Sequence, residues 1–87
     1  MSDERLRRRG LLAEKEQRAQ LLALKVRALK RQLNELTDPH RDIKDINTTE
    51  LRMHVDDLQA ATEAFDALLK EIASLREDLG MPRYEIR

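Results

Sequence analysis

Apolar residues in the first half of the chain recur at alternating intervals of three and four, interrupted only at Lys15. This spacing keeps apolar side chains on one face of an α-helix, in the heptad manner of a coiled coil. It predicts a helix over about residues 3–36. The core positions on this helix are Leu12, Ala19, Leu22, Val26, Leu29 and Leu33, and Leu36 follows at the same spacing.

The second half repeats the pattern in strict alternation of three and four. Asn47, with Glu50 three residues later, resembles a capping box, and Gly80 supplies a residue suited to a helix end. These features predict a second helix over about 48–79. Its core positions are Leu51, Leu58, Phe65, Leu68, Ile72, Leu75 and Leu79, with His54 and Ala61 at the same spacing.

The connection over 37–47 breaks the heptad pattern. Asp38 before Pro39 favours a short turn of helix there, and we expect Ile43 and Ile46 to pack back onto the helices. Two long helices joined by a short connection predict an antiparallel hairpin. Residues 1–80 therefore form a single all-α helical-hairpin domain, and residues 81–87 form a C-terminal tail that is loose or docks weakly.

The two predicted helices carry opposite charge. Residues 1–36 hold ten basic and five acidic residues, net +5, whereas residues 48–87 hold five and nine, net −4. Folding the hairpin about its connector brings Arg7 and Arg8 toward Glu77 and Asp78, and such pairs favour this register over slipped ones. The same register brings Arg18 toward Glu63 or Asp66. The core pairs in this register are Leu33 with Leu51, Val26 with Leu58, Ala19 with Phe65 and Leu12 with Ile72.

The first helix has more apolar surface than one neighbouring helix can cover. Leu21, Leu24 and Ala28 form a second stripe opposite the core face, and with Leu11 they are the predicted dimer or partner interface. A chain of 87 residues builds only a small core, so association adds stability. We expect a homodimer in the form of a four-helix bundle. The alternative is that the connector or the tail covers this stripe.

The composition argues against catalysis, cofactor binding and metal binding. Phe65 and Tyr84 are the only aromatic residues, cysteine is absent, and His54 has no second ligand near it in sequence. Adjacent acids such as Asp56 and Asp57 diverge by about 100° on a helix, so they do not form an acid–base pair. We expect no enzyme, no cofactor, no metal site and no small-molecule substrate.

The same composition indicates a compartment. The opening residues lack the apolar core of a secretory signal, and no run of the sequence reaches the roughly 20 apolar residues of a membrane span. The absence of cysteine suits a reducing environment. We expect a cytoplasmic protein without a membrane partner.

Four arginines near the N-terminus suggest a second kind of partner. Arg5, Arg7, Arg8 and Arg9 could contact the phosphates of a nucleic acid. A short arginine run is also typical of a solvated helix face, and the net charge of zero gives no overall attraction for a polyanion.

A resemblance supports the choice of a protein partner. A short cysteine-free chain with an arginine-rich start and the helix LAEKEQRAQLLALKVRALKRQLNEL resembles the small helical accessory proteins of temperate, Mu-like bacteriophages. This resemblance implies a small protein that regulates or inhibits a host or phage protein by binding it, and it assigns no residue roles. The leading interpretation is therefore a dimeric protein interaction module. A nucleic-acid-associated protein and a structural coiled-coil spacer are the alternatives.

Overall fold

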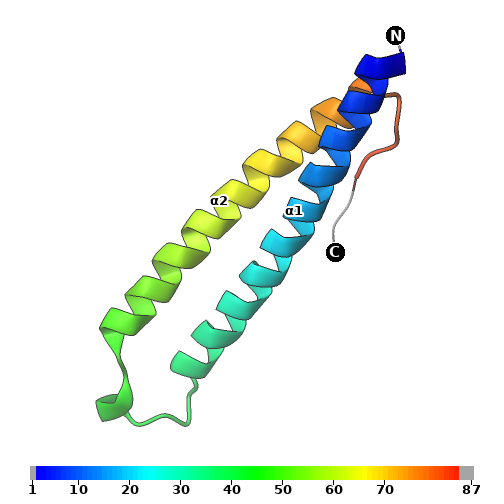
Figure 1. Cartoon of the computed structure of the whole chain (residues 1–87). Coiled ribbons are helices and arrows are strands. Elements are labelled where there is room, and N and C mark those ends of the chain that lie inside the picture. The colour runs from blue at the N-terminus through cyan, green and yellow to red at the C-terminus, as the bar shows by residue number, and fades with distance from the viewer. Residues whose placement is uncertain (1, 85–87) are drawn as a thin grey trace.

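The protein is a hairpin of two long helices, seen in a computed structural model that describes residues 2–84 (Figure 1). Helix α1 spans Ser2–Leu36, a short 3-10 helix η1 spans Ile43–Asp45, and α2 spans Thr48–Asp78. No strand occurs within the described range. The prediction of an all-helical chain with two helices packed against each other is confirmed.

The two ends of α2 are capped as its sequence suggests. The side chain of Asn47 accepts a hydrogen bond from the backbone N–H of Glu50 at 3.0 Å. At the other end Gly80 has φ 67°, and the N–H of Met81 donates to the carbonyl of Arg76 at 2.8 Å. The N–H of Gly80 also donates to the carbonyl of Glu77, which completes a Schellman motif and turns the chain back.

The connector is less compact than its two isoleucines suggest. Asp38 accepts a hydrogen bond from the N–H of His40 at 2.9 Å, but helical structure begins only at η1. Ile43 is 88% exposed and Ile46 is exposed as well. The expectation that these two residues pack onto the helices is wrong, because both side chains remain exposed to solvent.

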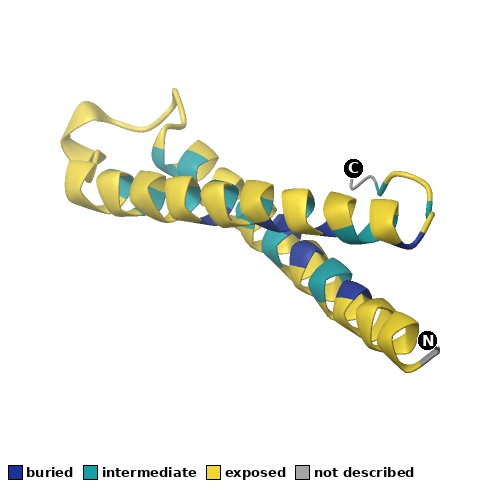
Figure 2. Ribbon diagram, turned by 90° about the horizontal axis from the view of Figure 1, so that it is seen from above, coloured by how far each residue is buried: buried dark blue, intermediate teal, exposed yellow. Residues whose placement is uncertain are grey.

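Packing between the helices is uneven along a molecule of 64 × 20 × 14 Å. The two helices lie at an angle to each other: they run side by side toward the connector in Figure 1, and the N-terminal part of α1 diverges from α2 in Figure 2. Most buried residues lie in the part of the hairpin distant from the connector (Figure 2). The core cluster consists of Leu12, Ala19, Leu68, Ile72 and Leu79, and the other buried residues are Ala23, Leu29 and Ala61.

The remaining predicted core positions are only half-buried. On α1 these include Leu33, and on α2 they include Leu51, both close to the connector. Ala23, which is outside the predicted core, is buried. The other half-buried core positions are Leu22, Val26, Leu58, Phe65 and Leu75.

Candidate interaction surface

The face of α1 that points away from α2 carries a long uncharged stripe, here called the outer stripe. Its members follow one another at intervals of three or four, so they lie on one side of the helix over about 33 Å. All of them are exposed, and Leu6, Leu21 and Leu24 have exposures of 64, 60 and 58%. The outer stripe consists of Leu6, Gly10, Ala13, Gln17, Leu21, Leu24 and Ala28.

Three of the four predicted interface residues belong to the outer stripe. Leu11 is exposed too, but it lies about 100° around the helix from the neighbouring stripe residue Gly10, between the stripe and the core face. Neither the connector nor residues 79–84 cover Leu21, Leu24 and Ala28, which remain exposed. Within the described residues, the alternative of an internal cover for this stripe is therefore wrong.

The edges of the outer stripe are mainly basic. Arg7, Arg18 and Lys25 follow one edge, together with the single acid Glu14, and Arg9 lies on the other edge. All five are exposed. A partner that binds the outer stripe contacts these charges along the edges of the stripe.

A shallow groove lies between the two helices in the connector half. Val26 and Lys30 line it from α1, and Thr62, Phe65 and Asp66 line it from α2, around a volume of about 260 Å³. That volume is below the usual range for small-molecule sites, and the lining mixes the apolar side chains of Val26 and Phe65 with the charged Lys30 and Asp66.

The N-terminal arginines are divided between internal and solvent-facing roles. A guanidinium nitrogen of Arg5 donates to the carbonyl of Leu79 at 3.3 Å, and Arg8 forms an ion pair with Glu4 at 3.0 Å. The expected pairing of Arg8 with the acids at the end of α2 is wrong, because Glu4 lies one helical turn away on α1 itself.

The other two arginines of the cluster, Arg7 and Arg9, are exposed, and Arg7 makes no ion pair with the acids of α2. Arg5 lies three and four residues before Arg8 and Arg9 and so shares a side of α1 with them, whereas Arg7 points to the opposite side. Arg18 likewise forms no ion pair with any residue of the described range. A phosphate backbone running along one face would meet only part of the arginine cluster.

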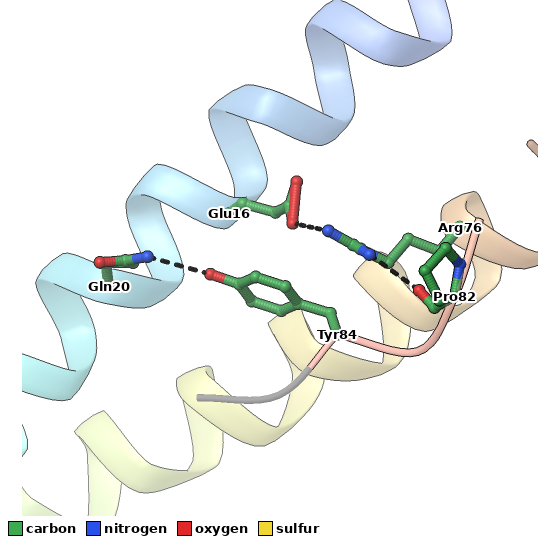
Figure 3. Close-up of polar contacts among 5 residues, drawn as sticks. All are labelled: Glu16, Gln20, Arg76, Pro82 and Tyr84. Atoms are coloured by element: carbon green, nitrogen blue, oxygen red, sulfur yellow. Dashed lines mark hydrogen bonds and ion pairs between the residues drawn. The ribbon is translucent and has the colours of Figure 1, made fainter. Parts of the chain in front are cut away.

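Residues after α2 dock between the helices in an arrangement here called the tail clasp (Figure 3). Arg76 forms an ion pair with Glu16 at 2.6 Å and donates to the carbonyl of Pro82 at 2.7 Å. Its guanidinium lies 4.8 Å from the centre of the Tyr84 ring, whose hydroxyl accepts a hydrogen bond from Gln20 at 3.3 Å. The clasp therefore joins α1, α2 and residues 82–84, whereas residues 85–87 of the expected tail lie outside the described range.

The interhelical ion pairs were missed in the sequence, although Lys15 gave a hint of one. Lys15 takes an apolar position of the heptad pattern, and its ammonium lies 2.9 Å from a carboxylate oxygen of Glu71. A charged residue at such a position calls for a partner on the facing helix. Glu16 and Arg76 do not take apolar positions of the heptad pattern, so the sequence provides no signal for their pairing. Their contact depends on how α2 crosses α1.

His54 is half-buried near the start of α2. Its Nε2 lies 3.6 Å from a carboxylate oxygen of Glu50, and its buried Nδ1 has no hydrogen-bond partner. Across residues 2–84, no group of three or more histidines and acids is placed to hold a metal ion. No helix of the described chain combines the length and apolar character needed to cross a membrane.

Comparison with known protein families, curated proteins and solved structures finds no match to this chain.

Proposed function

We propose that this protein is a non-catalytic interaction module that acts by stoichiometric binding, both to a second copy of itself and to a partner protein. The observation that carries the proposal is the outer stripe, where Leu21 and Leu24 stay exposed at 60 and 58% on a folded helix. Burial of one leucine side chain contributes about 1.5–3 kcal/mol. A row of them on a rigid helix is a typical recognition surface.

The hairpin supports binding in preference to catalysis. Its one interhelical groove described above is shallow, and the adjacent acids Asp56 and Asp57 are both exposed and point in different directions. A thin molecule of two helices has little interior in which to exclude water around reacting groups. The same thin shape leaves a large surface for contact with another protein.

The resemblance to small phage accessory proteins adds a role to this binding. It suggests a host or phage protein as the partner, with regulation or inhibition as the result. The connector end offers surface for such a partner while the outer stripe is engaged elsewhere. The exposed large apolar residues at that end are Ile43, Ile46, Met53 and Val55.

Charge reversal on the outer stripe tests the proposal. The double variant Leu21→Glu, Leu24→Glu should remain helical by circular dichroism, because both side chains are exposed, but should become monomeric or lose partner binding. Gln32→Glu with Asn34→Glu is the matched control, because it adds the same charge to exposed positions outside the stripe.

Size-exclusion chromatography with light scattering measures the assembly, and affinity capture from a native host measures partner binding. The proposal predicts that the control variant behaves as the unmodified chain in both measurements. Survival of assembly and of binding in the stripe variant would contradict it.

A further inference from the structure

The outer stripe of α1 has the same spacing when read in either direction. From Leu6 to Ala28 the intervals are 4, 3, 4, 4, 3 and 4, with Gln17 at the centre. Interfaces between identical chains related by a twofold axis need this property, because each residue must meet the same contact on both copies. The spacing therefore allows two outer stripes to face each other in antiparallel order about Gln17.

Side-chain size follows the same symmetry. In that antiparallel order every leucine of one stripe faces a small residue of the other, which lets helices approach closely and side chains interdigitate. At Gly10 the space is open, since an added Cβ meets no atom within 4 Å. The facing pairs are Leu6 with Ala28, Gly10 with Leu24, Ala13 with Leu21, and Gln17 with Gln17.

We propose that the outer stripe binds the outer stripe of a second copy, antiparallel, with the twofold axis at Gln17. The two Gln17 side chains meet at the axis, where each amide can donate to the other's carbonyl oxygen. This arrangement rests on the proposed interaction function and specifies the geometry of the dimer. The stripe points away from α2, so the four helices form a row with the two α1 helices inside.

The charged edges of the stripe give this dimer a distinctive salt dependence. Glu14 of one copy lies beside Arg18 of the other, near the axis, whereas Arg7 lies beside Lys25 and repels it. The edge charges named above, four basic residues against Glu14, sum to +3 on each copy, so the edges oppose association overall, and added salt screens that repulsion. Association should tighten between about 50 and 500 mM salt, whereas binding of an acidic helix or a nucleic acid to the same stripe weakens with salt.

A single introduced cysteine tests the axis, because the chain has none of its own. Gln17→Cys should form a disulfide-linked dimer under mild oxidation, since the two positions meet across the axis within reach of a disulfide. Asn34→Cys, which is exposed on α1 but distant from the axis, is the control and should stay largely unlinked. Equal linking of the two variants would overturn the arrangement.

A size exchange tests the register. Ala13→Leu places leucine against Leu21, and Leu21→Ala leaves alanine against alanine, so each change alone should weaken dimerisation about tenfold or more. The double variant restores one large and one small residue at that contact and should return to within about threefold of the unmodified chain. Both positions are exposed in the hairpin, so circular dichroism of all three variants should be unchanged.

The outcomes separate this inference from the proposed function. Simple addition of the two losses in the double variant, or weaker association at high salt, would overturn the antiparallel arrangement. If the variant Leu21→Glu with Leu24→Glu also kept its assembly and partner binding, both the proposed function and the antiparallel arrangement would be rejected. Loss of binding in that variant with no cross-link at Gln17 would retain the interaction module and reject its twofold geometry.

Discussion

The terminal half of the hairpin and the connector half are built from the same heptad pattern, but they pack differently. In the terminal half the cluster around Ile72 is buried, and Lys15 and Glu16 make ion pairs across the helices. In the connector half, Leu33 and Leu51 remain half-buried. A regular apolar pattern on two helices is thus compatible with both a closed and a partly open interface.

The difference follows from what fills the angle between the helices. In the terminal half, Met81 and Tyr84 pack against the core cluster, and Arg76 ties the tail to α1. The connector provides no such cover, since Ile43 is 88% exposed. Helices that cross at an angle diverge away from the crossing, and in the terminal half Met81 and Tyr84 fill part of that space.

The largest expected effect contrasts one core residue from each half. Ile72→Ala should lower the free energy of unfolding by about 2–5 kcal/mol, because Ile72 is fully buried and its truncation leaves a cavity. Leu33→Ala should cost about 1 kcal/mol, because a half-exposed side chain loses less burial. Urea unfolding at a fixed protein concentration measures both, and similar losses would show that the two halves are equally packed.

A smaller effect is expected from the tail clasp. Glu16→Gln should cost about 1–2 kcal/mol, since it leaves the guanidinium of Arg76 without its charged partner where the two side chains are only 15 and 20% exposed. Glu4→Gln is the control, because it removes an exposed pair with Arg8 on a single helix and should cost less than about 0.5 kcal/mol. The Glu16→Gln variant should show faster hydrogen exchange in the terminal half. Unchanged exchange there would mean that the clasp adds no stability.

The smallest effect is expected at the connector. Ile43→Ser should change the free energy of unfolding by less than about 0.5 kcal/mol, since its side chain loses no packing in the hairpin. Thermal unfolding followed by circular dichroism is sufficient to measure it. A loss above 1 kcal/mol would indicate that the connector packs against something in solution, such as a second copy.

The sequence by itself determined the local features of this protein. Heptad spacing defines the faces of both helices, Asn47 and Gly80 mark the ends of α2, and the apolar residues Leu21, Leu24 and Ala28 opposite the core face indicate part of the outer stripe. These are properties of residues within a few turns of each other, where helix geometry alone decides direction.

Only the tertiary structure decided which heptad positions become core and which charges meet. The angle between the helices buries Ala23 while leaving Leu33 half-exposed, and it brings Arg76 to Glu16 instead of bringing Arg8 to the end of α2. Periodicity along one helix carries no information about the crossing angle or about the docking of a short tail. Both depend on the combined packing of segments distant in the chain, which a pattern read one helix at a time does not contain.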